Sequence, residues 1–356
     1  MRLCDLIGMS PGRLPAGPLN AITDVPGVRV GHVTLIAGEG SVRTGVTAIL
    51  PHGDNLFREK VAAAVRTING YGKSIGFEQI RELGTLETPI TLTNTLNAGL
   101  VADAVIAYML RDNADIGVST GSVNPVVGEC NDGFLNDIRG RHVRQAAVWQ
   151  AIETASAGPV AEGNVGAGTG TSCFQFKGGI GTASRHVLDG QFTVGALVQT
   201  NFGARVELTM CGVPVGHHMQ EENLPTTGPG SIMIVLATDA PLDARQLGRL
   251  AMRAAFGLAR TGSTCHHGSG DFVIAFSTAN RYPHYPTALV QERSGLPTNA
   301  APTMNALFLA VIEAVEEAIL NALLAAETMT GRDGNTLHAI PQAKLIEIWR
   351  HYRPID

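Results

Sequence analysis

Several stretches of this sequence are apolar at almost every position over the length of a β-strand. In 231-SIMIVLAT-238, six of the seven residues after Ser231 are apolar, and 271-DFVIAFST-278 has a similar run. A strand with one face in water alternates apolar and polar residues, whereas a strand covered on both faces does not. The sequence therefore predicts β-sheets that are buried on both sides.

The wider pattern predicts strands in the interior and helices outside them. Asp243 is a potential cap for the clearest helix, in which leucines and alanines recur at helical spacing, and Gly262 is a plausible stop. With 44% hydrophobic residues the chain can form a sizeable core, and we predict one α/β domain built as a layered sandwich. Strands are predicted at 27–36, 43–51, 89–95, 172–187, 192–203, 231–238 and 271–278, and helices at 97–111, 142–156, 243–260 and 301–327.

Charge and composition argue against nucleic-acid binding, membrane insertion and secretion. The net charge of −5 is spread without long runs, so nucleic acid is not an expected partner. The long apolar stretch 306–327 is interrupted by acidic residues, so no membrane span is expected, and the N-terminus does not resemble a signal peptide. Five scattered cysteines without a CxxC motif indicate free thiols in a reducing cytoplasm.

Two motifs suggest ligands but fail on detail. The glycine run 163-GNVGAGTGTS-172 lacks the lysine of a phosphate-binding loop and precedes a predicted strand instead of a helix, so a turn lining a pocket or an oligomer contact is favoured. The pairs His217-His218 and His266-His267 are adjacent in sequence, and adjacent residues on a strand point to opposite faces. We expect no metal site and no cofactor.

The best candidates for catalytic residues include two serines. Ser231 follows the turn residues 228–230 and precedes a buried strand, so it is either ordinary turn chemistry or a nucleophile placed to attack the peptide bond before it. Ser269 and Asp271 are two residues apart and face the same way on an extended backbone, where they could form a hydrogen-bond relay. A simple Gly-Ser-Gly-Asp turn is the alternative.

Nine blocks along the chain form a more specific pattern. They are 18-PLNAITDVPGVRVGH-32, 42-VRTGVTAILP-51, 89-PITLTNT-95, 126-VVGECNDGFLNDI-138, 158-GPVAEGNVGAGTG-170, 176-FKGGIGTASR-185, 194-VGALVQTNFG-203, 228-GPGS-231 and 268-GSGDFVIAFSTAN-280. In this order they resemble the DmpA-type self-processing aminopeptidases, N-terminal serine hydrolases that include the β-peptidyl aminopeptidases. The resemblance implies a four-layer α-β-β-α sandwich and self-cleavage between Gly230 and Ser231, into residues 1–230 and 231–356.

The residues around the implied cleavage point suit that reaction. Gly228 and Gly230 tolerate backbone angles closed to other residues, and Pro229 fixes one dihedral between them, so the amide before Ser231 can be strained. Cleavage would free an α-amine on Ser231 with a reference pKa of about 7.7–8.0, which can act as a base near neutral pH. The hydroxyl and its base would then lie on one residue.

The remaining roles are carried over from the resemblance. Asn201 matches an oxyanion-hole asparagine, and Ser269 and Asp271 match the hydroxyl and acid that orient the nucleophile and its amine. The β-peptidyl members have a glutamate where this chain has Asp271, so we place it nearer the DmpA type.

Substrate binding shows one departure from the family pattern. Glu129, in 128-GECNDG-133, matches the acid that holds the substrate's ammonium group. Processed relatives have a tyrosine in this segment that donates to the oxyanion, whereas this chain has Asn131 and Phe134. Losing one oxyanion donor can lower turnover on the order of 10²–10³.

The resemblance implies an aminopeptidase that releases small N-terminal residues of L, D or β type from peptides, amides or esters with a free amino group. A homo-oligomer, a tetramer of cleaved pairs, is also implied. One alternative is an acyltransferase of the ornithine acetyltransferase type, but its nucleophile is a threonine, and Thr226 and Thr227 lie too early in the turn. The other is a non-catalytic relative with the same fold.

Overall fold

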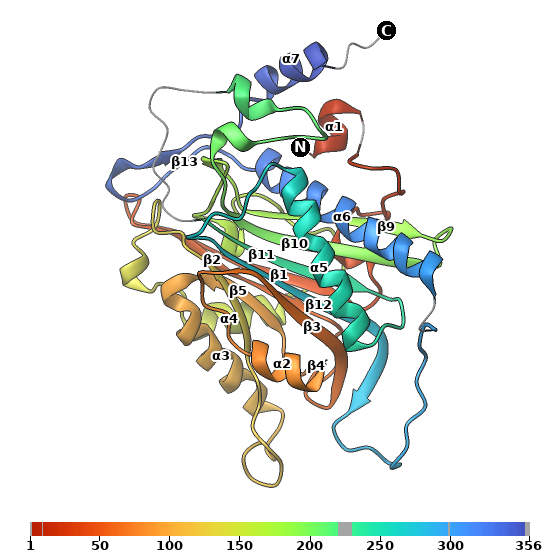
Figure 1. Cartoon of the computed structure of the whole chain (residues 1–356). Helices are drawn as coiled ribbons and strands as arrows, with labels where there is room; N and C mark the ends of the chain where they lie inside the picture. Colours follow the sequence, from red (N-terminus) through yellow and green to blue (C-terminus); the bar gives the residue numbers. More distant parts are fainter. Residues whose placement is uncertain (1, 9, 220–229, 298–299, 353–356) are drawn as a thin grey trace.

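The computed structural model describes residues 2–8, 10–219, 230–297 and 300–352 and contains two β-sheets that lie face to face (Figure 1). Strands β5 and β6 pair in parallel, as do β11 and β12, and the other neighbours in the two sheets are antiparallel. In spatial order, the first sheet contains β1 (Arg29–Ala37), β2 (Val42–Leu50), β5 (Ile90–Asn94) and β6 (Val126–Cys130). The second contains β4 (Thr85–Leu86), β3 (Glu59–Gly70), β12 (Gly270–Pro283), β11 (Ser231–Thr238), β10 (Phe192–Asn201) and β9 (Ile180–Val187).

Helices cover the outer faces of both sheets. Helices α3 (Ala98–Arg111) and α4 (Gln145–Glu153) pack on the first sheet, and α5 (Ala244–Arg260) and α6 (Ala301–Leu324) pack on the second. The predicted α-β-β-α sandwich is therefore confirmed. The smaller elements are α1 (Leu3–Ile7), α2 (Phe77–Leu83), α7 (Gln342–Tyr352), and the hairpins β7 (Ser172–Cys173) with β8 (Phe176–Lys177) and β13 (Met329–Thr330) with β14 (Thr336–Leu337).

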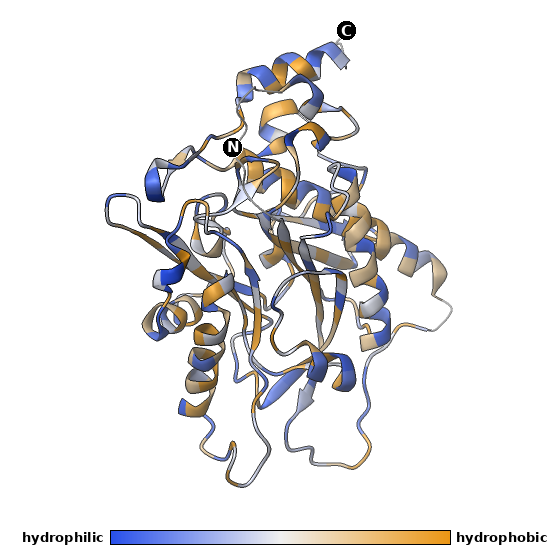
Figure 2. Cartoon of the chain, turned by 60° about the vertical axis from the view of Figure 1, so that its left-hand side comes forward, coloured by the Kyte–Doolittle hydropathy of each residue, from blue (hydrophilic) through white to orange (hydrophobic). Residues whose placement is uncertain are grey.

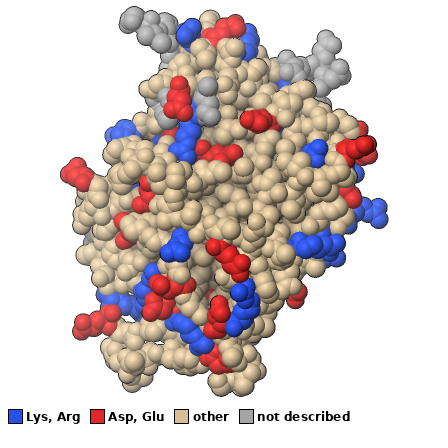
Figure 3. All heavy atoms as spheres, turned by 180° about the vertical axis from the view of Figure 1, so that it is seen from behind, with Lys and Arg blue, Asp and Glu red and all other residues tan. Residues whose placement is uncertain are grey.

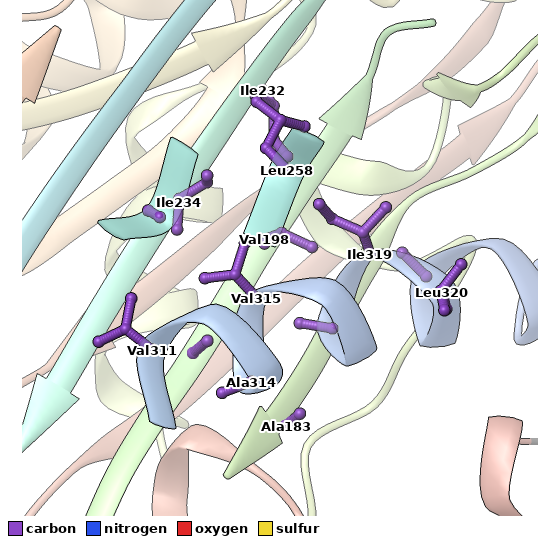
Figure 4. Packing of buried hydrophobic residues seen from close by; sticks show 14 of the residues in the cluster. Ala183, Val198, Ile232, Ile234, Leu258, Val311, Ala314, Val315, Ile319 and Leu320 are labelled. Atoms are coloured by element: carbon purple, nitrogen blue, oxygen red, sulfur yellow. The ribbon is translucent and has the colours of Figure 1, made fainter. Parts of the chain in front are cut away.

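The apolar strands are buried because each sheet is covered twice. Met233 and Val235 of β11 point into the space between the sheets, where they join Ile90 and Val126 of the first sheet. The residues of β11 between them, such as Ile232 and Ile234, face α6. Figure 4 shows side chains of α6 packed against the second sheet. Figure 2 shows the same division, with hydrophobic residues inside and hydrophilic ones outside. All eight residues of β11 are buried, as its sequence predicts.

Local signals place the ends of α5 correctly. The Asp243 carboxylate accepts a hydrogen bond from the backbone N–H of Gln246 (2.6 Å), and the Gln246 side chain accepts one from the N–H of Asp243 (3.0 Å). This reciprocal cap satisfies two N–H groups that the first helical turn leaves unpaired. Gly262 follows the helix with a φ of +98°, which suits glycine at a helix end.

Other predictions need correction. The strand predicted at 172–187 is three separate strands, β7, β8 and β9, because Phe174 and Gln175 adopt positive φ angles of 49° and 61° and reverse the chain. Strand β3 was not predicted, since 59-EKVAAAVRTING-70 is rich in alanine and polar residues. Strand β6, 126-VVGEC-130, was also not predicted.

The surface fits the composition. Figure 3 shows acidic and basic side chains interspersed on one face of the molecule. Within the described part of the chain, no helix combines the length and apolarity that crossing a bilayer requires.

Candidate active site

Ser231 lies at one end of the second sheet, as the first residue of the central strand β11. The antiparallel register pairs it with Asn201, the last residue of β10. The parallel register on its other side pairs it with Gly270, between Ser269 and Asp271. The fold therefore brings together three sequence segments that were singled out separately.

The Ser231 hydroxyl lies against the carbonyl that precedes it. Its Oγ donates to the carbonyl oxygen of Gly230 at 2.7 Å. The backbone N–H of Gly270 donates to that same oxygen (3.2 Å) and to Ser231 Oγ (3.3 Å). A nucleophile and a hydrogen-bond donor thus converge on the Gly230–Ser231 peptide group. Gly228 and Pro229 lie outside the described residues.

Ser269 and Asp271 form the hydrogen bond that their spacing predicts. Ser269 Oγ donates to Asp271 Oδ1 at 2.5 Å, and both side chains are buried. Burial raises the pKa of Asp271, and the hydrogen bond from Ser269 opposes that rise. Its other oxygen, Oδ2, is buried and has no hydrogen-bond partner among the described residues.

The Ser269–Asp271 pair does not contact the nucleophilic hydroxyl directly. The register places Asp271 beside Ile232, on the face of the sheet that α5 and α6 cover. The Ser231 side chain projects from the opposite face because successive residues of a strand alternate. Within the described residues, no hydrogen bond joins Ser231 to Ser269 or Asp271.

Asn201 presents an amide nitrogen at this end of the sheet. Its Oδ1 accepts hydrogen bonds from the backbone N–H and the hydroxyl of Ser172, both at 3.1 Å. A backbone N–H can only donate, so this contact fixes which end of the amide is oxygen. The Nδ2 group has no acceptor among the described residues. Among the described residues, this donor has no partner, and Asn201 pairs with Ser231 across the sheet.

Glu129 is a buried carboxylate on β6 with both oxygens engaged. Oε1 accepts the backbone N–H of Lys73 at 2.8 Å, and Oε2 accepts the Thr95 hydroxyl. Burial raises the pKa of Glu129, and these two hydrogen bonds oppose the rise. A Cβ placed on Gly72 would lie 3.2 Å from Glu129 Oε1 and 3.2 Å from the Cα of Gly270. Gly72 thus lies between Glu129 and Gly270, the residue that pairs with Ser231.

Asn131 and Phe134 lie in the loop after β6. Asn131 is exposed, and its Oδ1 accepts the N–H of Gly133 at 2.8 Å. Phe134 is half-buried, and its carbonyl accepts from Asn335 at 2.9 Å. Neither is hydrogen-bonded to Ser231 within the described residues, and their part in substrate binding stays a prediction.

The histidine pairs have other partners. His266 contacts Glu207 at 2.8 Å, and His218 contacts the Tyr352 hydroxyl at 2.8 Å. In the described ranges, no group of three or more His, Cys, Asp or Glu side chains could hold a metal ion.

Sequence analysis did not identify the segment 71–73, which connects the Ser269 backbone to Glu129. The backbone N–H of Tyr71 donates to the Ser269 carbonyl at 3.2 Å, and two residues later Lys73 donates to Glu129. Ser172, which holds Asn201, was also missed. No local sequence signal marks these residues, since their role depends on contacts between distant segments.

Comparison with known proteins gives consistent matches over nearly the whole chain. Residues 20–337 match the model of peptidase family S58. The β-peptidyl aminopeptidase BapA of Sphingosinicella microcystinivorans is 45% identical, over 95% of this chain and 89% of the relative. A β-aminopeptidase structure from a Burkholderia species has a TM-score of 0.93 and 44% identity, and covers 100% of both chains. The L-aminopeptidase D-Ala-esterase/amidase of Ochrobactrum anthropi has a TM-score of 0.90 and 41% identity, over 99% of this chain and 98% of that one.

Proposed function

The chain belongs to peptidase family S58, and on that premise we propose that it is a self-processing aminopeptidase whose nucleophile is Ser231. The observation that carries the proposal is the position of Ser231 Oγ, 2.7 Å from the oxygen of the carbonyl that it must attack. The relatives described above with functional names are peptidases, which disfavours an acyltransferase. The threonines that such an acyltransferase would need as nucleophile, Thr226 and Thr227, lie outside the described residues.

Self-cleavage proceeds by attack of Ser231 Oγ on the carbonyl carbon of Gly230. The new C–O bond replaces the C–N bond, and the hydroxyl proton ends on the Ser231 nitrogen. During the attack the Gly270 N–H, 3.2 Å from the carbonyl oxygen, stabilises the negative charge. Water then hydrolyses the ester, which leaves a carboxylate on Gly230 and restores the hydroxyl. The products are residues 1–230 and 231–356.

Substrate hydrolysis uses the amine that cleavage creates. The Ser231 α-amine takes the hydroxyl proton as Oγ attacks the substrate carbonyl, and later gives it to the leaving amine. We assign the free Nδ2 of Asn201 to the oxyanion. We assign Ser269 and Asp271 to orienting the new amine, since Asp271 is a buried carboxylate and a cationic neighbour favours its charged form.

Glu129 supplies specificity for a free N-terminus. Its two hydrogen bonds favour the ionised carboxylate, against the rise in pKa that burial causes, and fix its orientation for binding the substrate's ammonium group. The substrates are small peptides, amides or esters whose first residue has a free amino group. The identities of 45%, 44% and 41% do not separate β-peptidyl from α-amino acid preference.

A first experiment tests both activities on the purified protein. Intact-mass measurement is expected to show two chains that correspond to 1–230 and 231–356. A panel of α-, β- and D-amino acid p-nitroanilides is expected to include substrates that the cleaved protein hydrolyses. A chain that stays whole after long incubation and hydrolyses none of them contradicts the proposal.

Metal removal is expected to leave the activity unchanged. The proposed chemistry uses an α-amine, a hydroxyl and a carboxylate, none of which needs a metal ion. The measurement is turnover of the best p-nitroanilide before and after exhaustive dialysis against EDTA. Activity that disappears on dialysis and returns with zinc would instead assign a catalytic role to the histidine pairs.

Assembly and location are further proposals. We propose a homo-oligomer of cleaved pairs, a tetramer, in a reducing cytoplasm, on the family resemblance and the cysteine pattern of the sequence. Light scattering coupled to size-exclusion chromatography measures the assembly directly. A monomeric mass for the processed protein would refute this part.

A further inference from the structure

The glycine run 163–172 forms a cage for a buried ammonium group. Lys177, one of four lysines in the chain, has no exposed surface. Its Nζ donates to the carbonyl oxygens of Gly168 (3.0 Å), Thr171 (2.9 Å) and Gly178 (2.6 Å). Three donors of a lysine thus meet three backbone acceptors.

This arrangement reverses the polarity of a phosphate-binding loop. In such loops the backbone N–H groups point at a bound anion. Here the N–H groups of Gly166 and Ala167 donate to the hydroxyls of Thr34 and Thr47, whereas carbonyl groups point at a cation that belongs to the chain itself. The glycine run therefore folds around an internal charge.

The cage is continuous with the residue that holds Asn201. Thr171, whose carbonyl binds Lys177, is followed directly by Ser172, which donates two hydrogen bonds to Asn201 Oδ1. On the other side of the cage, Gly179 exchanges hydrogen bonds with Thr200, the neighbour of Asn201. The two ends of the segment 172–179 thus contact β10 at residues 201 and 200.

We propose that Lys177 is a positioning residue for the oxyanion-stabilising amide of Asn201, and that it acts through the loop 168–172. This rests on the proposed role of Asn201. The ammonium group closes the loop, the closed loop places Ser172, and Ser172 aims the amide so that Nδ2 faces away from it. Lys177 itself does not touch the substrate.

Charge supports a dedicated role for this lysine. Burial lowers the pKa of Lys177 to about 7, and the nearby Cys173 and Asp132 act against that fall. Asp132 is also buried, and its Cβ lies 3.0 Å from where a Cβ on Gly170 would be. A buried ammonium is costly unless it is well bonded, and here three backbone carbonyls of the segment that adjoins Ser172 supply those bonds.

The test is a double-mutant cycle between Lys177→Met and Asn201→Ala. Methionine matches the lysine side chain up to Cε and removes only the Nζ group, and with it the charge and the donors. We expect kcat to fall about 10- to 100-fold in Lys177→Met, less than the 10²–10³ typical of losing an oxyanion donor outright. KM for free-amine substrates should stay within about twofold, because Glu129 is untouched. All proteins are incubated until self-cleavage is complete before turnover is measured.

The cycle separates positioning from general destabilisation. If Lys177 acts through Asn201, Lys177→Met should cost less than about twofold further in the Asn201→Ala background. An equal loss in both backgrounds overturns the proposal. The control is Lys60→Met at the far end of β3, which removes an ammonium bound to the Phe57 carbonyl (3.0 Å) and ion-paired with Glu87 (3.0 Å), and it should leave kcat unchanged.

A second measurement does not depend on activity. Hydrogen–deuterium exchange of Lys177→Met should be faster than that of the wild type in peptides covering 168–178 and 199–203, and unchanged elsewhere. Faster exchange in 168–178 alone overturns the inference, whereas a wild type that neither cleaves nor hydrolyses overturns the proposed function only. If Lys177→Met is insoluble, Ser172→Ala removes the next link and should reproduce the lower kcat and the faster exchange of 199–203. Unchanged kcat and exchange in Ser172→Ala also overturn the inference.

Discussion

Ser231→Ala is expected to remain a single chain of 356 residues and to show no aminopeptidase turnover. The substitution removes the hydroxyl that lies 2.7 Å from the Gly230 carbonyl oxygen, and without it no bond to that carbonyl can form. The uncut chain also lacks the α-amine, so both nucleophile and base are lost together. Deleting a comparable nucleophile lowers kcat by about 2 × 10⁶. Electrophoresis, intact mass and p-nitroanilide hydrolysis measure these outcomes.

The control must remove a buried hydroxyl without touching the site. Ser277 suits this purpose, since its Oγ donates to the Ala240 carbonyl at 2.6 Å, at the other end of the segment where β11 and β12 pair. Ser277→Ala should be processed and active. A Ser231→Ala protein that still separates into two chains would show that another group attacks, and would remove Ser231 from the centre of the mechanism.

The strands that sequence predicts well are those whose signal is local. The run 231–238 is apolar throughout, and burial on both faces follows from that alone. Strand β3 has no such run, yet it pairs with β12 along its whole length, because the pairing is decided by the neighbouring strand. The break of 172–187 depends on a positive φ at Phe174, a residue type for which no sequence rule predicts it.

The candidate site shows the same limit more strongly. Ser231, Asn201 and Gly270 are adjacent only because of strand register, which no single segment encodes. The family resemblance named Ser231 and Asn201, but neither the role of Gly270 nor the contacts between the three. The placement of Asp271 on the face opposite the Ser231 side chain follows from the register and could not be derived from the spacing of Ser269 and Asp271.

Supporting residues are the hardest to foresee. Lys73 and Thr95 hold Glu129 from segments far away in sequence, one of them through its backbone alone. Lys177 did leave a trace, as one of two charged residues, with Arg185, in the predicted strand 172–187. That trace indicates a buried charge but not what the charge binds, because the three carbonyl partners become visible only once the loop is folded.

Glu129→Gln is expected to cleave itself normally but to lose much of its turnover. Self-cleavage needs no external amine, so Glu129 has no part in it. Glutamine can still accept the Lys73 N–H and meet the Thr95 hydroxyl, so the local packing is kept. The charge that binds the substrate's ammonium is lost, and a hydrogen bond to a charged group contributes about 1.5–3 kcal/mol. We therefore expect kcat/KM for free-amine substrates to fall about 10- to 150-fold.

Three readouts on this variant distinguish ammonium binding from a structural role. Processing and thermal stability should match the wild type, and N-acetylated substrates should be equally poor for both proteins, since they have no cation to bind. Glu87→Gln is the matched control: that buried carboxylate also accepts a backbone N–H, from Asn124 at 2.9 Å, but lies at the far end of β3. If Glu129→Gln lowers processing, stability and turnover together, Glu129 supports the fold. Unchanged turnover of free-amine substrates would exclude Glu129 from the binding site.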